Sequence, residues 1–303
     1  MLAEIFRRMV AFGPLETYCY VGFGSVWFSD FVLFHRTLGV RKMLSIEKST
    51  ASRDRFVDNS PFKIDFDFRP SSQALPDVDY SSRQFIWLDY DDPLSLGMLG
   101  DAAIVASRAA SGTLLAISVQ CSRAPEIALA EKELALDENA AGPEERFRQT
   151  FGADRVPANL TREDLAGWPF GELSRSMLYA EIEKAVAARK LVQPDTAVTA
   201  TRIVDFEYED GAKMTTIVVL FCSDAERHCF AAAAMNGLDF RSTDGSPVYI
   251  PTPKLTLKEF RFLERQLPLA QGAELQIGHI PPGEAREFAK MYRYFPNFAI
   301  VES

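Results

Sequence analysis

Two glycines at the end of a strand-like run could form part of a ligand-binding loop. The stretch Val21-Gly22-Phe23-Gly24-Ser25 permits a sharp turn, and glycine lets the backbone approach a ligand closely. The helix predicted to follow would also present unpaired N–H groups at its start. A Gly-x-Gly pair is nevertheless common, and it fits an ordinary tight turn as well as a nucleoside-binding loop.

A carboxylate and two hydroxyls follow this loop at intervals that suit a nucleoside site. Glu47 lies 23 residues after Gly24, and a carboxylate at that point can accept both hydroxyls of a ribose. Ser71 and Ser72 lie in the loop 69–76, after the third strand-like run. Each signal is weak alone, but each falls at the expected end of a strand.

The acidic stretch Asp89-Tyr90-Asp91-Asp92-Pro93 leaves three interpretations open. Asp89 and Asp91 are candidates for a general base, because neighbouring carboxylates raise each other's pKa. Asp91 and Asp92 would instead cap a helix if one begins at Pro93. The pair of Asp89 and Asp91 could also bind Mg²⁺, but no matching acid is visible later in the chain, so we predict no metal site.

Short apolar runs alternate with helical patterns over the first 120 residues. We predict strands at 17–23, 42–48, 63–68, 84–90 and 113–120. Helices are predicted between them, at 26–39, 49–62 and 93–112. This alternation indicates crossover units in an α/β fold with a mostly parallel, doubly wound sheet. Ligands bind at the carboxyl ends of the strands in such sheets, which is where the motifs above fall.

The character of the chain changes after Gln120. Residues 121–197 read as mainly helical, and 197–222 hold two β-rich arms around Asp210-Gly211, a strong hairpin signal. A helix at 224–236, one after the capping box Thr256–Glu259, another near Gly283 and a strand at 297–303 would follow. We therefore predict a Rossmann-like core, a helical insert, a hairpin unit that completes the core and a C-terminal α+β extension, at 1–121, 122–197, 198–237 and 238–303.

In this order the motifs resemble those of class I S-adenosylmethionine-dependent methyltransferases. They are most similar to the O-methyltransferase branch: Val-Gly-x-Gly-Ser at 21–25, Ser-Ile-Glu at 45–47, Ser-Ser-Gln-Ala-Leu-Pro at 71–76 and Trp-Leu-Asp-Tyr-Asp at 87–91. The resemblance covers residues 15–121, and the hairpin at 200–222 would supply the terminal antiparallel strand pair of this fold. It implies S-adenosylmethionine as the cofactor.

The resemblance also implies the roles of individual residues. Gly22, Gly24 and Ser25 would line the methionine part of the cofactor. Glu47 would hold the ribose, and Asp89 would lie between the cofactor's amino group and the acceptor. Lys48 would lie at the adenine edge and Ser71 or Ser72 near the ring. The cofactor-binding set that we predict is Tyr20, Gly22, Phe23, Gly24, Ser25, Glu47, Lys48, Ser71, Ser72 and Asp89, and the catalytic candidates are Asp89 and Asp91.

Tyr20 and Trp27 depart from the pattern of this family. Tyr20 stands where a carboxylate usually precedes the glycine loop and helps to hold the cofactor's ammonium group, so Asp30 or Glu16 would have to substitute for it. Trp27 stands where small residues are usual. It also occupies the position of the third glycine in the Gly-x-Gly-x-x-Gly motif, which argues against a nicotinamide-dependent oxidoreductase. A degenerate fold that serves as a binding or assembly module therefore stays open beside an active methyltransferase.

Composition limits the acceptor and the environment. The 303 residues carry a net charge of −9, which argues against a strong nonspecific grip on nucleic acid. The acceptor stays open between a small-molecule hydroxyl and a nucleic acid. We expect no membrane span, since no run of about eighteen apolar residues occurs, and four scattered cysteines fit a reducing cytoplasm. The helix predicted at 174–190 would suit internal packing or a homodimer.

Overall fold

The predicted alternation of strands and helices is present in the structure. The structure, a computed structural model, describes residues 1–48 and 51–295. The strands of its sheet are β1 Cys19–Gly22, β2 Lys42–Ile46, β3 Asp65–Asp67, β4 Gln84–Pro93, β5 Thr113–Gln120, β6 Thr199–Asp210, β7 Ala212–Cys222 and β8 Val248–Ile250. Within the described residues they form one sheet in the order β3-β2-β1-β4-β5-β7-β6-β8.

The strand pairings confirm a mostly parallel sheet with an antiparallel hairpin. β1 pairs in parallel with both β2 and β4, β2 with β3, and β4 with β5. β7 pairs with β5 in the antiparallel sense, and the turn between β6 and β7 contains Gly211 at a φ of 73°. Since β2 and β3 lie on one side of β1 and β4 and β5 on the other, the topological switch point lies between β1 and β4. Ligands bind outside the carboxyl ends of the strands at such a point.

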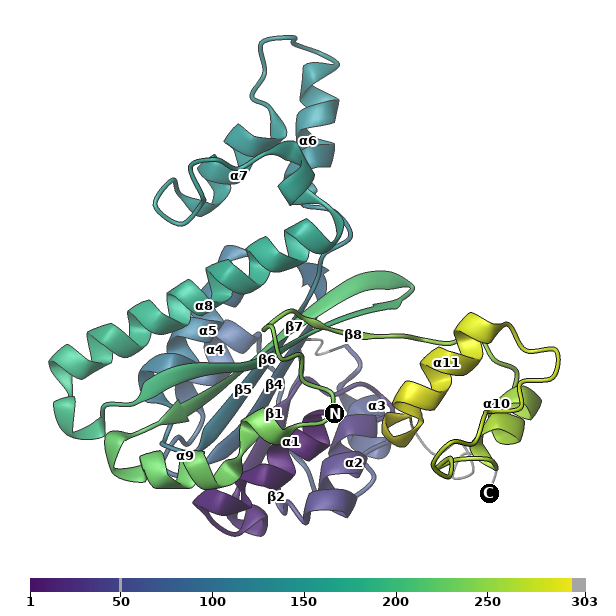
Figure 1. Cartoon of the computed structure of the whole chain (residues 1–303). Coiled ribbons are helices and arrows are strands. Elements are labelled where there is room, and N and C mark those ends of the chain that lie inside the picture. Colours follow the sequence, from purple (N-terminus) through teal and green to yellow (C-terminus); the bar gives the residue numbers. More distant parts are fainter. Residues whose placement is uncertain (49–50, 296–303) are drawn as a thin grey trace. The chain divides into compact units, whose positions relative to one another are not determined.

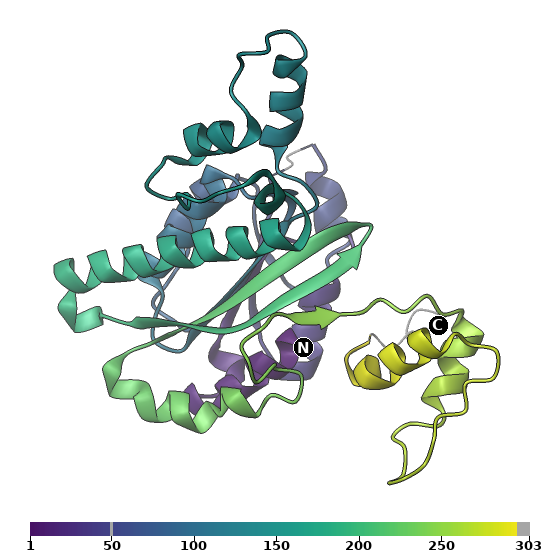
Figure 2. The same ribbon diagram turned by 45° about the horizontal axis from the view of Figure 1, so that its top comes forward.

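Helices cover both faces of this sheet, with α5 and α8 on one face and α1 and α2 on the other (Figure 1, Figure 2). The helices up to the hairpin and just after it are α1 Leu2–Arg8, α2 Ser29–Leu38, α3 Arg53–Asp58, α4 Ser71–Ala74, α5 Leu96–Arg108, α6 Pro125–Leu134, α7 Pro143–Phe151, α8 Gly167–Val192 and α9 Arg227–Ala233. Because both faces are covered, β5 reads as a continuous apolar run, and its residues from Thr113 to Val119 are all buried.

The long helix α8 is fastened to the sheet by a buried arginine. Arg175 is 1% exposed, and its guanidinium pairs with Glu207 at 2.9 Å and with Asp205 at 3.6 Å, both on β6. It also pairs with Glu172 of its own helix at 2.6 Å and donates to the Thr215 hydroxyl on β7. The same helix packs against α5 and β7, so the residues between β5 and β6 extend the core on one face.

Among the described residues, 208–211 and 249–295 form a second compact unit. Its helices are α10 Leu257–Glu264, which begins after the predicted capping box of Thr256 and Glu259, and α11 Pro282–Met291. Its core comprises Leu263, Ile280, Ala285 and Phe288. The strand predicted at 297–303 lies outside the described residues. In the part of the chain that the structure covers, no helix combines the length and the hydropathy that crossing a membrane requires.

Replacing Arg175 should destabilise the fold far more than replacing a surface arginine. We expect Arg175→Ala to lower the free energy of unfolding by about 3–5 kcal/mol, because it breaks a buried ion pair and leaves the largely buried Glu207 carboxylate without this partner. Urea denaturation checks this. Arg155→Ala is the matched control, because the pair of Arg155 with Glu181 is partly exposed and should contribute about 1 kcal/mol or less. Equal losses in the two variants would contradict this account.

Candidate functional site

A cavity of about 440 Å³ lies at the carboxyl ends of the strands on both sides of the switch point. This volume falls within the range of about 300–1,000 Å³ usual for small-molecule sites. The structure places most of the predicted site residues on its walls. These are Phe23, Gly24, Ser25, Glu47, Lys48, Ser71, Ser72, Asp89 and Asp91. Tyr20 and Gly22, which were also predicted for the site, are not among the lining residues.

The glycine loop is held against β2 by hydrogen bonds through a serine. The N–H of Gly24 donates to Ser45 Oγ at 3.1 Å, and the Ser45 hydroxyl donates to Glu47 Oε1 at 2.6 Å. A Cβ on Gly24 would collide with both Ser45 Oγ and Glu47 Oε1. Glycine is therefore required here for the close approach of two chain segments, which brings the loop and the carboxylate to one corner of the cavity.

Glu47 is a buried carboxylate on the cavity wall. Its residue is 6% exposed, and burial raises its pKa to about 7, while hydrogen bonds from Ser45 and from the Gly24 N–H act in the opposite direction. The nearby Asp30 carboxylate raises it further. A buried carboxyl group on a cavity wall can accept hydrogen bonds from the two hydroxyls of a ribose.

Tyr20, the residue that departs from the expected carboxylate, points its hydroxyl at an acid from the next helix. The ring is fully buried and packs edge-on against Phe31 and Phe34. Its hydroxyl donates to Asp30 Oδ2, and burial raises the pKa of Tyr20 well above its usual value. Of the two acids that could replace the missing carboxylate, Glu16 precedes β1 and is exposed at the amino edge of the sheet. Asp30 is the acid that reaches the loop.

The interpretation of Asp91 and Asp92 as helix caps is wrong. β4 continues to Pro93 with an irregular register against β5 after Asp89, so both acids belong to the strand. Helix α5 begins only at Leu96, and its cap is Ser95, whose side chain accepts the N–H of Met98 at 3.4 Å. Asp92 instead forms an exposed ion pair with Lys48 at 3.7 Å.

Asp89 and Asp91 occupy different environments. Asp91 is exposed, whereas Asp89 is largely enclosed and its Oδ1 has no hydrogen-bond partner among the described residues. Burial raises the pKa of Asp89 to about 6, and the charges of Asp91 and Asp30 add to this, while a hydrogen bond with Ser118 opposes it. An enclosed carboxylate with a raised pKa is suited to accept a proton near neutral pH. Asp89 is therefore the better candidate for a base.

Asp101, a buried acid on α5, is a residue of the cavity wall that was not predicted from the sequence. Asp101 is 2% exposed, and its Oδ2 accepts the hydroxyls of Ser71 at 2.5 Å and Tyr90 at 2.6 Å. It thereby ties α4 and β4 to α5 on the wall of the cavity that contains the serines. A signal was present, since Asp101 lies three residues after Met98 and four before Val105, on the apolar stripe of the helix.

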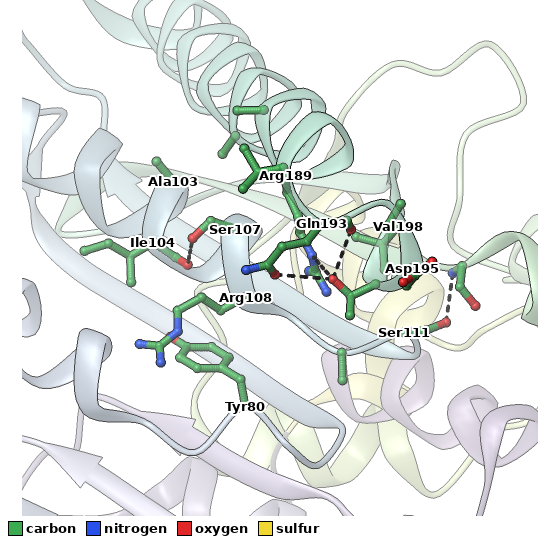
Figure 3. A pocket seen from close by; sticks show the side chains of 17 residues that line it. Tyr80, Ala103, Ile104, Ser107, Arg108, Ser111, Arg189, Gln193, Asp195 and Val198 are labelled. Carbon is green, nitrogen blue, oxygen red and sulfur yellow. Dashed lines mark hydrogen bonds between the residues drawn. The ribbon is translucent and has the colours of Figure 1, made fainter.

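A larger hollow of about 1110 Å³ lies at the other edge of the sheet. Figure 3 shows its lining, from the C-terminal ends of α5 and α8 and the segment before β6. Arg108 lies over the Tyr80 ring there, and Arg189 donates to the carbonyl oxygen of Ala109 at 2.7 Å. Both arginines therefore make contacts that stabilise the fold locally. This hollow lies at the amino ends of the parallel strands, so it receives none of the predicted site residues.

The residues at 1–48 and 51–295 contain no cluster of three histidine, cysteine or acidic side chains arranged to hold a metal ion. The pair of Asp89 and Asp91 is accordingly not part of such a cluster in this part of the chain.

A family model described as "Putative O-methyltransferase" matches the chain over residues 1–303. The chain belongs to this family. Membership confirms the resemblance to S-adenosylmethionine-dependent methyltransferases, and with it the expectation of a methyltransferase that uses this cofactor. The observed strand order, with its terminal antiparallel pair, agrees with the fold class predicted from that resemblance.

The chain is also similar to several solved structures. For LepI in complex with S-adenosylmethionine, identity is 8%, the TM-score is 0.38, and the match covers 72% of this chain and 46% of LepI. For Trm1 from Pyrococcus horikoshii with S-adenosylmethionine, identity is 10%, the TM-score is 0.43, and the match covers 75% of this chain and 56% of Trm1. For an O-methyltransferase family protein from Burkholderia thailandensis, identity is 10%, the TM-score is 0.36, and the match covers 74% of this chain and 56% of that protein. The chain spans about half the length of these three proteins. No curated protein sequence matches it significantly.

The raised pKa of Glu47 predicts how the stability of the ligand-free protein depends on pH. The pKa of Glu47 is about 7 in the folded state, against 4.5 for an ordinary glutamate. Between these values the unfolded chain has lost this proton and the folded protein still holds it, so the free energy of unfolding falls as the pH rises. Glu47→Gln carries no charge at this position, so its free energy of unfolding at pH 8 should exceed that of the wild type by about 1–3 kcal/mol. This advantage should shrink towards pH 4.5.

Urea denaturation followed by tryptophan fluorescence at the two pH values measures the difference. Glu138→Gln, at an exposed position, is the control and should show no such dependence. A Glu47→Gln effect of equal size at both pH values would show that the Glu47 carboxyl is not perturbed in the fold.

Proposed function

We propose that this methyltransferase transfers the methyl group of S-adenosylmethionine to the hydroxyl oxygen of a small molecule. The observation that supports this acceptor class is the charge of the cavity. Its lining includes five acids, which are Glu47, Asp89, Asp91, Asp92 and Asp101. Lys48 is the basic side chain on the described lining, and it is paired with Asp92. Such a wall repels the phosphates of a nucleic acid, whose binding needs lysine and arginine.

The residues of the cavity fit the cofactor. Glu47 would hold the ribose, the loop from Gly22 to Ser25 would lie along the methionine part, and Ser71 and Ser72 would border the base. Ile46, Pro70 and Met98 contribute apolar surface to the same cavity. When bound, S-adenosylmethionine would supply a methyl group on a sulfonium, and the neutral thioether S-adenosylhomocysteine would leave as the methyl group is transferred. The acidic wall complements that positive charge.

Asp89 would act on the acceptor. A hydroxyl is a weak nucleophile until its proton leaves, and a carboxylate in hydrogen-bond reach can take that proton as the oxygen gains the methyl group. The rest of the rate enhancement would come from holding the two reactants in line within the cavity. Asp91 is exposed at the rim and is better placed to contact the acceptor than to take its proton.

An assay of acceptor classes tests the proposal. Formation of S-adenosylhomocysteine from S-adenosylmethionine is measured with a panel of phenols and aliphatic alcohols, and separately with tRNA and single-stranded DNA. We expect turnover with members of the first group and none with the nucleic acids. Methylation of nucleic acid alone would overturn the acceptor class. Failure to bind S-adenosylmethionine or S-adenosylhomocysteine in calorimetry would favour the degenerate binding module instead.

Replacing Asp89 by asparagine should slow the chemical step. With the best acceptor of that panel, we expect Asp89→Asn to lower kcat by about 10²–10⁴-fold, as is usual for loss of a general base. Asp91→Asn makes the same chemical change two residues away on an exposed side chain, and should stay within a few-fold of the wild type. A larger loss in Asp91→Asn than in Asp89→Asn would reverse the two assignments.

A further inference from the structure

Asp89 lines the cavity, and a base in that position needs a neighbouring group that fixes its orientation. This inference rests on the proposed function, in which Asp89 takes the proton of the acceptor's hydroxyl. Asp89 Oδ1 has no hydrogen-bond partner among the described residues, so the carboxylate can still accept a further donor. The strand beside β4 supplies a group that can hold the carboxylate in place.

Ser118 on β5 lies directly opposite Asp89. The two residues are partners in the parallel ladder of β4 and β5, and theirs is the last pair before the register becomes irregular. Because paired residues of neighbouring strands direct their side chains to the same face, the Ser118 hydroxyl lies beside the Asp89 carboxylate. A hydrogen bond from that hydroxyl to the carboxylate joins the two side chains.

Two further donors surround the Ser118 hydroxyl. The indole N–H of Trp87, two residues before Asp89 on β4, donates to Ser118 Oγ at 2.9 Å. Thr216 on β7 is the ladder partner of Ser118 on its other side, and the two hydroxyl oxygens lie 2.9 Å apart. Ser118 is 0% exposed and Thr216 3%, so water does not compete for these hydrogen bonds.

These neighbours determine where the proton of Ser118 goes. A hydroxyl oxygen has two lone pairs and one proton. When Trp87 and Thr216 donate to Ser118 Oγ, both lone pairs are occupied, and the proton is left for the Asp89 carboxylate. Three adjacent strands thus contribute one row of polar side chains that ends at the cavity.

The other charged groups near Asp89 give this hydrogen bond its importance. Asp91 on the same strand and Asp30 on α2 are both acids, and with burial they raise the pKa of Asp89. Tyr20 on β1 offers no opposing charge, since burial raises the pKa of its own hydroxyl well above the usual value. Donation from Ser118 is the interaction that favours the ionised form of Asp89.

We propose that Ser118 is a positioning residue for Asp89, whose carboxylate it holds by a hydrogen bond in the orientation that meets the acceptor's hydroxyl. Trp87 and Thr216 direct the Ser118 proton to that carboxylate. None of these three residues is among those that line the cavity, so each acts through Asp89.

A titration of the Asp89 carboxyl tests the hydrogen bond without any need for turnover. Protein labelled with ¹³C at the aspartate carboxyls is titrated by NMR, and the Asp89 signal is identified by its absence in Asp89→Asn. We expect Ser118→Ala to raise the pKa of Asp89 by about one pH unit, because a donor to the charged form is lost. Thr216→Val should raise it by less, since Ser118 keeps its proton but loses a donor that directs it.

Ser174→Ala is the matched control for this titration. Ser174 on α8 is as fully buried as Ser118, but its hydroxyl donates to the carbonyl oxygen of Phe170 at 2.7 Å. The pKa of Asp89 should therefore stay at its wild-type value in this variant. Thermal unfolding shows whether each variant is folded, and Thr216→Val carries the test if Ser118→Ala is not.

The pH profile of turnover tests the positioning role. With the most active phenol or alcohol of the panel, the acid limb of kcat/KM should move to higher pH in Ser118→Ala by the same amount as the titration. The variant should thus be about tenfold slower than the wild type below that limb, and the loss should shrink towards pH 8. A loss of equal size at every pH would overturn the positioning role.

The outcomes separate this inference from the proposed function. If Asp89 titrates at the same pH in the wild type and in Ser118→Ala, Ser118 does not hold its carboxylate, whatever the turnover. If the titration moves but Asp89→Asn turns over like the wild type, the base assigned in the proposed function is wrong. The catalytic purpose of Ser118 is then overturned with it.

Discussion

The hydrogen bonds from the Gly24 N–H to Ser45 and from Ser45 to Glu47 fix the glycine loop against β2, and the site is arranged around that contact. The contact exists only because residue 24 has no side chain. It brings together two strand ends that parallel pairing places at the same edge of the sheet. A backbone cradle and a buried carboxyl thereby share one corner of the cavity.

The same edge concentrates negative charge at a cost to the folded protein. The enclosed carboxyl groups of Glu47, Asp89 and Asp101 all have raised pKa values, for which burial is the first cause in each case. A surface evolved for stability alone would not gather these groups. A cofactor that carries a sulfonium and an ammonium would offset the repulsion, which is the usual relation between a strained site and its ligand. Elsewhere the fold compensates its buried charge internally, as at Arg175.

Tyr20, one of the two departures of the glycine loop from the family pattern, forms a local arrangement with residues of α2. Tyr20 fills the space above β1 with an aromatic ring, which packs on the phenylalanines of α2. The ring packed in this way places its hydroxyl against Gly22, where it donates a hydrogen bond to Asp30. Trp27 takes no part in the core, and its side chain is 78% exposed. The strand therefore carries a hydroxyl where the family pattern has an acid, and that hydroxyl is paired with an acid on the helix.

The sequence by itself determined the order of the elements and the motifs at the strand ends. Local patterns carry this information, because a β-rich run, a Gly-x-Gly turn and an Asp-Gly hairpin act over few residues. Parallel pairing then requires the carboxyl ends of β1, β2 and β4 to meet. The start of α5 was misplaced, since the acids after Asp89 extend the strand instead of capping a helix. Only the tertiary structure placed Asp30 beside Tyr20 and Glu16 on an exposed segment, gave Asp89 and Asp91 different environments, and showed Asp101. These depend on burial and on contacts between segments 10 to 30 residues apart, which no local pattern records.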